Sequence, residues 1–465
     1  MQAFVTSSRS LDRGVLKCVQ KCVRSKTGKL AMPAYTSDAL RELVKPDRVH
    51  RDIYLDPEIF ELEMDRIYGR AWVYIGHESQ VPHPGDFFCS WLGTQPVVMT
   101  RDINNKVHVL HNRCGHRGVK VVNEQRGNSK FLRCMFHGWA YSMNGELTGL
   151  TQPEGYTELD VDPVAYGMPK VARFDSIHGF VFASGYGEGP SLREYFGGVV
   201  SALDDIAAYA PDGEVEVTGG MLRYGYPGNW KFQTDNSCDM YHVVYSHESS
   251  RSGDTQYIRR EGDKSGIPFF DERGKVLSFD AFGLWGFEQG HGWEGAVAQS
   301  HGNTAPYYQD YVKILEDRHG KERAMQILDR KRHNTIFYPN VVIQDLNLHV
   351  RVIRPIRVDL TEVTIFPIKL KGAPEEMFQE SVKLLNTTNS AASLTQADDV
   401  EGFIRSQCGN RTRNANPWLL IARGSSAEEV LDQDYKGGHR TFASSEMLLR
   451  FQYQSWLNWM TLEAA

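Results

Sequence analysis

Hydrophobic residues follow two different periodicities along the chain. From Asp56 to Arg70 (DPEIFELEMDRIYGR) they recur at helical spacing behind an acidic first turn, which predicts a helix. From Val73 to Gly185 the pattern changes to short runs rich in β-branched and aromatic residues, such as PVVMTR, KVHVLHNR and GFVFASG, separated by Gly, Asn and Pro. This second pattern predicts a small antiparallel β domain.

From about Leu192 onward both periodicities occur. Helical spacing predicts helices over Ser191–Tyr209, Tyr307–Arg332, Glu375–Thr387, Leu394–Gln407 and Ser445–Met460. Alternating patterns predict strands over Glu214–Arg223, Thr335–Ile343, His349–Ile356 and Glu362–Ile368. The glycine-rich stretch Gly283–Gly302 predicts a loop. The predicted fold class is therefore α+β, with a small antiparallel β domain and a larger domain in which helices flank an antiparallel sheet.

The chain divides into three parts on these patterns. Residues 1–31 carry seven basic residues against one acid and lack the apolar core of a secretory signal, so we interpret them as a disordered extension or a mis-assigned start before Met32 rather than as a targeting peptide. The small β domain is predicted to span residues 71–190. Residues 32–70 and 191–465 are predicted to form the larger domain together.

Composition narrows the class of protein. Hydrophobic residues make up 41% and charged residues 24% of the chain, and the net charge is −6, which is typical of a soluble globular protein and argues against nucleic acid as a partner. No apolar run is long enough to span a membrane. Seven cysteines in 465 residues are too few for a disulfide framework, which favours the reducing cytoplasm.

Two cysteine–histidine pairs lie within the predicted β domain. Cys114-x-His116 is followed, after 17 residues, by Cys134-x-x-His137, and glycines stand in both loops. Two Cys and two His suit either one tetrahedral zinc or a [2Fe–2S] cluster with two Cys on one iron and two His on the other. The Cys-His order of both pairs and their hairpin-like loops favour the iron–sulfur cluster, which would act as an electron relay.

The sequences of these loops resemble a known family. RCGHRG and CMFHGWAYSMNGEL are similar to the Rieske cluster loops of aromatic-ring-hydroxylating oxygenases, although Met135 stands where a proline is common. The resemblance implies that the two Cys-His pairs hold the [2Fe–2S] cluster and that Trp139 packs over the cluster loop. It also implies a second, oxygen-activating metal further along the chain.

A second set of metal-ligating residues follows in the larger domain. His242 and His247 are five residues apart, with Asp239 just upstream. Positions i and i+5 of a helix point about 140° apart, so two inward ligands need a distorted or ending helix. Two histidines and one carboxylate, with open positions beside them, are the ligand set of mononuclear Fe(II) oxygenases. The candidate for a distant carboxylate is the pair Asp398-Asp399.

The family pattern implies a role for each of these residues. DNSCDMYHVVYSH resembles the iron-site segment of the family, which implies His242 and His247 as iron ligands. In QADDVEGF the aspartate at the ligating position is Asp399, and Asp398 is the alternative. Asp239 matches the acid that links a Rieske histidine of the neighbouring subunit to His242. The resemblance covers roughly Asp52 to Gly409.

The resemblance implies the catalytic large (alpha) subunit of a terminal dioxygenase. NAD(P)H-derived electrons would reach the [2Fe–2S] cluster through a reductase, with or without a ferredoxin, and cross through Asp239 to Fe(II), which activates O2 beside a small aromatic substrate. The product would be a cis-dihydrodiol or a phenol. Family members form rings of three large subunits, α3, often with three small beta subunits, α3β3.

Substrate recognition is expected next to the inferred iron site. Met240 and Val243 on the iron-site segment, and Asn389 and Leu394 before Asp399, are predicted to line the pocket. The stretch HNTIFYPNVVI…RVIRPIRVDLTEVTIF resembles oxygenases that act on aromatic carboxylates of the benzoate, salicylate or terephthalate type. An arginine would suit bidentate carboxylate binding, and three compete for that role: Arg332, Arg351 and Arg354.

Two other functions remain open at this point. A Rieske monooxygenase or O-demethylase would use the same irons, and product analysis separates it from a dioxygenase, because only the dioxygenase places both oxygen atoms in one product. A non-enzymatic zinc-binding scaffold would use only the two Cys-His pairs. Colour separates that scaffold from an iron–sulfur protein, which is red-brown.

Overall fold

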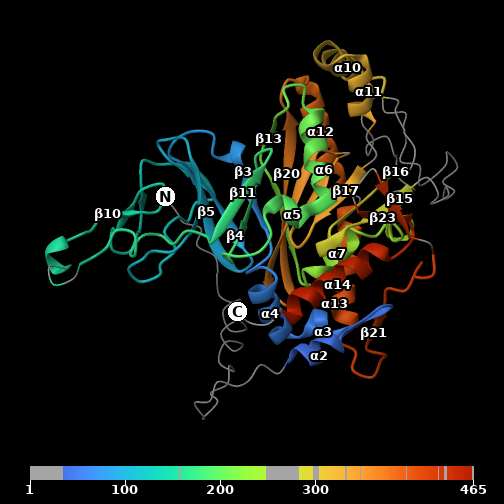
Figure 1. The fold of residues 1–465 in the computed structure, drawn as a ribbon, viewed down its shortest axis with the longest axis horizontal. Helices are drawn as coiled ribbons and strands as arrows, with labels where there is room; N and C mark the ends of the chain where they lie inside the picture. The colour runs from blue at the N-terminus through green and yellow to red at the C-terminus, as the bar shows by residue number, and fades with distance from the viewer. Residues whose placement is uncertain are drawn as a thin grey trace, which may run out of the picture.

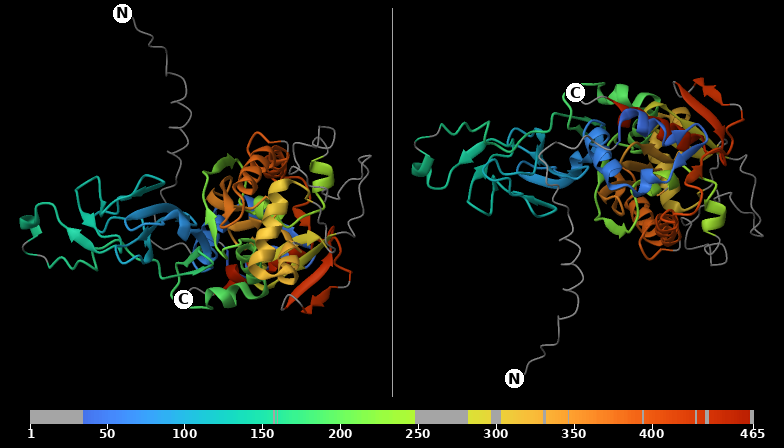
Figure 2. Two further views of the ribbon diagram at one scale, coloured as in Figure 1. Left: turned by 90° about the horizontal axis from the view of Figure 1, so that it is seen from above. Right: turned by 90° about the horizontal axis from the view of Figure 1, so that it is seen from below.

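The structure is a computed structural model that describes residues 35–156, 158, 160–247, 282–296, 303–329, 332–345, 347–393, 395–427, 429–433 and 437–462. The predicted extension at residues 1–31 lies outside this part of the chain. A small β lobe projects from a larger body in which helices surround a long sheet (Figures 1 and 2). The predicted α+β class is confirmed. No helix within the described ranges has the length and apolar character to cross a membrane.

The small lobe consists of two antiparallel sheets. Strands β4 (Asp86–Leu92), β5 (Gln95–Arg101), β6 (Val107–His111) and β7 (Arg126–Asn128) form one sheet in the order β6-β5-β4-β7. Strands β8 (Leu132–Arg133), β9 (Ala140–Tyr141) and β10 (Leu147–Gly149) form the other. Buried side chains from both sheets, among them Val98, Leu110 and Tyr141, make a hydrophobic core of their own. The lobe therefore has the independent core expected of a small β domain.

A third sheet joins the lobe to the body. Strands β3 (Val73–His77), β11 (Arg173–Ile177) and β12 (Phe180–Ser184) form it in the order β11-β12-β3. Val73 pairs with Ala183, so the chain enters and leaves the lobe side by side. Phe180 and Phe182 pack into the core of the larger body.

The body is built on a ten-stranded antiparallel sheet. Its strand order is β13-β20-β19-β18-β17-β16-β15-β23-β22, with β14 also paired to β20. The strands are β13 (Val215–Val217), β14 (Leu222–Tyr226), β15 (Phe282–Gly286), β16 (Gly292–Ala296), β17 (Arg332–Phe337), β18 (Val341–Gln344), β19 (His349–Arg357), β20 (Leu360–Leu370), β22 (Val430–Asp432) and β23 (Gly438–Phe442). The two long predicted strands, at 349–356 and 362–368, are β19 and β20.

Helices cover the sheet, and segments from both ends of the chain meet below it. They are α2 (Ser37–Arg41), α3 (Asp52–Leu55), α4 (Pro57–Arg66), α5 (Leu192–Phe196), α6 (Ser201–Tyr209), α7 (Lys231–Asn236), α8 (Val243–Ser246), α10 (Pro306–His319), α11 (Lys321–Leu328), α12 (Glu375–Thr388), α13 (Gln396–Gly409) and α14 (Met447–Thr461). In Figure 1 the blue helices α2–α4 lie near the red helix α14, and α2 and α4 contact it. A small sheet, β1 (Val44–Lys45), β2 (Arg48–His50) and β21 (Trp418–Leu420), also joins the two ends.

The structure contradicts the loop predicted at Gly283–Gly302 as far as residue 296, because β15 and β16 form a buried hairpin there. Residues 297–302 lie outside the described part of the chain. Trp285 and Trp293 stack with their ring centroids 3.7 Å apart across the hairpin. The glycines reflect crowding rather than flexibility: a Cβ on Gly283 would lie 2.8 Å from the Trp285 ring, and one on Gly292 would lie 2.7 Å from Leu448. Glycine in a strand often marks such a close approach.

Four other predicted elements are divided by turns. The strand predicted over 214–223 is β13 and β14, which are separated at Gly219 and Gly220, with φ at +79° and +99°. The helix predicted over 191–209 breaks at Gly197, where φ is +52°. The helix predicted over 307–332 breaks at Gly320, with φ at +79°, and Arg332 already begins β17. The strand predicted over 335–343 is the hairpin β17–β18, which turns at the cis bond between Tyr338 and Pro339. The hydrophobic pattern on both sides of such a turn has the same period, so the pattern alone does not show where the turn lies.

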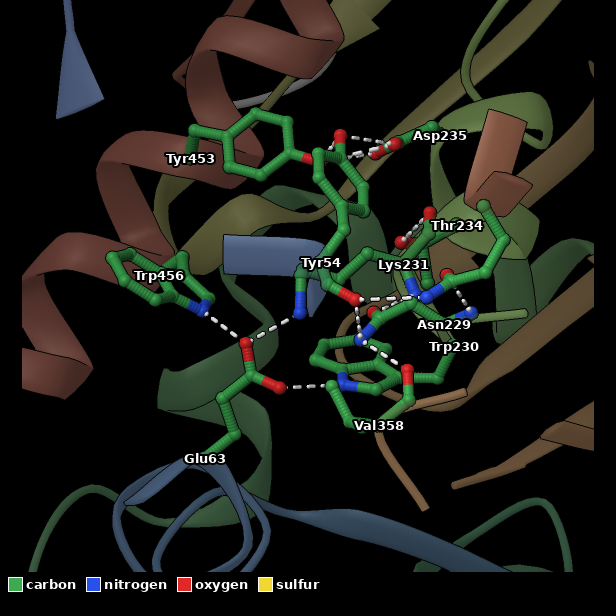
Figure 3. Close-up of polar contacts among 11 residues, drawn as sticks. Tyr54, Glu63, Asn229, Trp230, Lys231, Thr234, Asp235, Val358, Tyr453 and Trp456 are labelled. Atoms are coloured by element: carbon green, nitrogen blue, oxygen red, sulfur yellow. Dashed lines mark hydrogen bonds and ion pairs between the residues drawn. The ribbon is translucent and has the colours of Figure 1, made fainter. Parts of the chain in front are cut away.

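A buried polar network fastens the N-terminal helices to α7 and α14 (Figure 3). Glu63 of α4 accepts hydrogen bonds from Lys231 Nζ at 2.5 Å, from the Trp456 indole at 2.7 Å and from the Trp230 indole at 2.8 Å. The side chains of Glu63 and Lys231 are 0% and 3% exposed. Since α7 leads directly into the segment that carries His242 and His247, this network holds that segment in the fold.

A second buried carboxyl lies at the other end of α7. Asp235 accepts hydrogen bonds from the hydroxyls of Tyr54 at 2.8 Å and Tyr453 at 2.8 Å (Figure 3). Burial raises the pKa of Asp235 to about 7, against the opposing effect of the two tyrosines. Helix α7 is thus tied at both ends to segments from the two termini of the chain.

Replacing Lys231 with methionine is expected to lower the free energy of unfolding by about 3–5 kcal/mol, because Glu63 is then left as a buried, unpaired charge. Urea denaturation measures the change. Lys45 supplies the control, since its 2.7 Å pair with Glu42 lies at the surface and its removal should cost less than about 1 kcal/mol. Equal effects of the two substitutions would contradict the role given to Lys231.

Candidate functional site

The two Cys-His loops have the same backbone geometry. In the first, the Cys114 N–H donates to the Val119 carbonyl at 2.8 Å, and the Gly118 N–H donates to the Cys114 carbonyl at 3.0 Å. In the second, the Cys134 N–H donates to the Trp139 carbonyl at 2.8 Å, and the Gly138 N–H donates to the Cys134 carbonyl at 3.0 Å. Both glycines have φ near +75°, a conformation that side chains disfavour. The glycines noted in the sequence therefore close two matching turns.

These loops bring two thiols and two imidazoles together within the lobe. The cysteines are buried, and the rings of His116 and His137 lie 4.7 Å apart. Trp139 stacks on His116 with centroids 4.7 Å apart and an interplanar angle of 11°. The Tyr141 hydroxyl lies 2.9 Å from Cys114 Sγ. Hydrogen bonds to cluster sulfurs are one of the means by which a protein sets a cluster's reduction potential.

The chemistry of the four donors fits a [2Fe–2S] cluster. A Rieske cluster is held by two cysteine thiolates on one iron and two histidines on the other. The two matching loops supply one cysteine and one histidine each, and the rings of His116 and His137 are neighbours.

The second ligand set lies where α13 packs against α7 and α8. His242 directly precedes α8 and His247 directly follows it, while Asp399 lies in the first turn of α13. Helix α8 has only four residues, so the two histidines flank a short helix and can both point toward Asp399. The distances from Asp399 Oδ1 to His242 Nε2 and His247 Nε2 are 3.5 and 3.2 Å. The three ligand atoms lie within 4.8 Å of one another, and two imidazoles with one carboxylate are a ligand set that would hold a mononuclear iron.

A second carboxylate lies near the Nδ1 atom of each imidazole, on the side of the ring opposite Nε2. Asp239 Oδ2 is 3.5 Å from His242 Nδ1, and Asp398 Oδ2 is 3.5 Å from His247 Nδ1. Asp398, the alternative ligand in the sequence, thus stands on the far side of His247 from Asp399. Partners of this kind fix the ring orientation and raise the basicity of a metal-bound histidine.

Electrostatics at the metal-free site follow from these contacts. Burial lowers the pKa of His242, but Asp239 and Asp399 outweigh it and raise that pKa to about 10. Burial raises the pKa of Asp399, but His242 and His247 outweigh it and hold that pKa well below its usual range. The carboxylate is therefore ionised and ready to bind a cation at neutral pH.

Asn236 is a further residue at this site that sequence reasoning missed. Its Nδ2 donates to Asp399 Oδ1 at 3.0 Å and lies 2.9 Å from His242 Nε2. Asn236 ends α7, so the network around Glu63 and Asp235 positions it. Its place in the segment DNSCDMYHVVYSH, three residues before Asp239, was the only signal available in the sequence.

The predicted pocket residues have different surroundings. Met240 is buried, and Val243 is partly buried against the main hydrophobic core. Asn389, at the end of α12, accepts a hydrogen bond from Thr388 Oγ1 at 2.7 Å. Leu394 lies outside the described residues. Their contact with a substrate stays a prediction.

Two family models match the chain: the Rieske [2Fe-2S] domain over residues 71–162 and the ring hydroxylating alpha subunit (catalytic domain) over residues 206–462. The anthranilate 1,2-dioxygenase large subunit of Acinetobacter baylyi is 32% identical over 385 residues, which cover 81% of this chain and 80% of that protein. The toluate 1,2-dioxygenase alpha subunit of Pseudomonas putida is 31% identical over 403 residues, with 82% and 86% covered.

The fold is also found in solved structures. Naphthalene 1,2-dioxygenase with indole bound in the active site matches with a TM-score of 0.78 at 23% identity, covering 92% of this chain and 95% of that one. Both halves of the chain, with their separate ligand sets, thus have counterparts in one family. The chain belongs to the Rieske-type ring-hydroxylating dioxygenases, as an alpha (large) subunit that carries a [2Fe–2S] cluster and a mononuclear iron.

Proposed function

We propose that this subunit hydroxylates the ring of an aromatic carboxylate, using O2 and electrons from NAD(P)H, to give a cis-dihydrodiol or a phenol. The observation that supports an oxygenase reaction is that one chain contains two iron-ligand sets. The substrate class is supported by relatives that are named for anthranilate, 2-halobenzoate and toluate.

In this proposal residues 71–190 form the Rieske domain, and residues 32–70 with 191–465 form the catalytic domain. The cluster is held by Cys114, His116, Cys134 and His137. The mononuclear iron is held by His242, His247 and Asp399, and it supplies the site at which O2 is activated.

The chain's own residues orient this chemistry. Asp239 lies next to Nδ1 of His242 and orients that ring so that its Nε2 faces Asp399. Asp398 lies next to Nδ1 of His247 and orients the second ring in the same way. Asp239 is also the proposed link from the iron site to a cluster histidine of a neighbouring subunit. Asn236 keeps the Asp399 carboxylate turned toward the two imidazoles through its 3.0 Å hydrogen bond.

The proposed partners follow from the large-subunit family. A reductase, with or without a ferredoxin, delivers electrons to the lobe at the second Cys-His loop, where Met135 and Phe136 are 82% and 55% exposed. The large subunits assemble as α3, or as α3β3 with a small beta subunit, and the enzyme works in the cytoplasm.

A product screen tests the substrate class. The holoenzyme, supplied with a compatible reductase, NADH and 18O2, is offered benzoate, anthranilate, salicylate and terephthalate, with toluene and naphthalene as neutral arenes. We expect an acid to yield a product carrying two 18O atoms or a phenol carrying one. Oxidation of the neutral arenes alone would contradict the carboxylate assignment, and demethylation of methoxybenzoates in their place would indicate an O-demethylase.

A further inference from the structure

One face of the central sheet carries a row of polar side chains. Residues directly opposite each other on neighbouring antiparallel strands lie on the same face. The register pairs Glu294 with Asn334, Asn334 with Gln344, and Gln344 with His349, so these four side chains cross strands β16 to β19 in one row. Arg351 lies two residues beyond His349 on β19, and therefore on the same face.

Much of the hydrogen-bonding capacity of this row is unused within the described part of the structure. Glu294 Oε2, Asn334 Oδ1, Gln344 Oε1 and both ring nitrogens of His349 are buried there without a hydrogen-bond partner. Buried polar groups in proteins are paired as a rule. A row of unpaired groups on one face therefore indicates a surface that takes a polar ligand.

Arg351 brings a fixed positive charge to this face. It is only 5% exposed, its Nε is buried without a partner, and its guanidinium forms no ion pair with a residue that the structure describes. Burying an unpaired guanidinium is costly. An anionic ligand that pairs with Arg351 would remove that cost.

The other two arginines considered from the sequence are already paired. Arg332 forms an ion pair with Asp205 and donates to Ser201 Oγ at 2.7 Å. Arg354 lies on the opposite face of β19, donates to Glu362 at 3.1 Å and stacks over the Trp91 ring. Of the three arginines that could bind a substrate carboxylate, only Arg351 is therefore left without an ion-pair partner among the described residues.

The face that carries Arg351 is directed toward the inferred iron site. Tyr224 shares this face by register, and its hydroxyl donates to Gln233 of α7 at 2.9 Å. Burial raises the pKa of Tyr224, Arg351 lowers it and Asp399 raises it, so Tyr224 lies within electrostatic range of both. Helix α7, on which this hydroxyl rests, ends at the Asn236 that contacts the iron-ligand set.

Glu294, at the other end of the row, also lies within electrostatic range of both Arg351 and the inferred iron ligand His242. Burial raises its pKa to about 7, and the charges of His242 and Arg351 both lower it. Its Oε1 accepts a hydrogen bond from Asn334 at 2.6 Å. Glu294 is therefore partly protonated at neutral pH and leaves the charge of Arg351 available to a ligand.

We propose that Arg351 binds the carboxylate of the aromatic substrate, with the polar row beside it receiving the remaining hydrogen bonds. This assignment rests on the proposed substrate class and names the residue that selects it. The planar guanidinium matches a carboxylate with two parallel hydrogen bonds. Held in this way, the ring of the acid extends from the sheet toward the inferred iron ligands.

Binding of benzoate, anthranilate and toluene to the holoenzyme, measured by titration calorimetry, tests the proposal. Arg351→Gln should raise the Kd of the two acids by about tenfold to a hundredfold, the usual worth of hydrogen bonds to a charged group, and leave toluene binding unchanged. Arg351→Lys keeps the charge but loses the planar fork, so an intermediate loss is expected. Arg357→Gln, at the exposed end of the same strand, is the matched control.

Each outcome separates the two claims. Unchanged acid binding by both Arg351 variants, or an equal loss for acids and toluene, overturns the role of Arg351. A wild-type enzyme that binds toluene but neither acid contradicts the substrate class itself. Iron content and the cluster's electron-spin signal are measured on every variant, and Arg351→Lys decides the matter if Arg351→Gln fails to retain its metals.

Discussion

Asp239→Ala is expected to leave both metal centres loaded while lowering product formation by about a hundredfold. Asp239 lies behind His242, 3.5 Å from Nδ1, and the loss of such a partner typically costs 10- to 100-fold in metal affinity or activity. If Asp239 is also the link between the two metal centres, the electron transfer step itself should slow. Stopped-flow measurement of cluster reoxidation, in the presence of substrate and O2, follows that step directly.

The control for this variant is Asp175→Ala, which removes an exposed carboxylate from β11. Asp239→Asn adds a second comparison, because it keeps the shape of the side chain and removes only its charge. Undiminished product formation by Asp239→Ala would exclude the link. Loss of the mononuclear iron would instead give Asp239 a role in metal retention.

Asp399→Ala is expected to remove the mononuclear iron and abolish product formation. Iron content should fall from about three to about two atoms per chain, while the Rieske electron-spin signal persists, because the [2Fe–2S] cluster lies in the separate lobe. Metal analysis and electron-spin resonance on the same sample measure both quantities.

Asp398→Ala is the matched comparison, since the two aspartates are adjacent and only Asp399 is close to both imidazole Nε2 atoms. We expect Asp398→Ala to keep its iron at high metal concentration and to bind it about 10- to 100-fold more weakly. The reverse result, with iron lost only from Asp398→Ala, would exchange the two assignments.

The two metal sites differed in how far the sequence could predict them. The Cys-His loops are local: their spacing and glycines specify turns that form within a few residues, and the structure contains those turns. Asp399 is distant from His242 along the chain, and no spacing rule joins them. Only the packing of α13 against α8 brings them together, so family resemblance had to supply the pairing.

Contacts that depend on strand register could not be read from the sequence. The row from Glu294 to His349 comes from four strands. Glycines lie in β16, Pro355 lies in β19, and a cis-proline turn separates β17 from β18, and these features obscure the alternating pattern. The same limit applied to the arginines. Arg332, Arg351 and Arg354 are equivalent in the sequence, and only the position of Asp205 and Glu362 in space shows which two are neutralised.

The pairing of β3 with β12 has a consequence for how such enzymes can be altered. Because Val73 and Ala183 are neighbours, the polypeptide between them begins and ends at one point of the parent fold. Chimeras joined at these two positions should accept the lobe of a relative, and with it another reductase, while the arginine and the iron ligands stay unchanged. In the proposed function, in which the reductase docks on the lobe, the electron donor and the substrate would then be selected by separate parts of the chain.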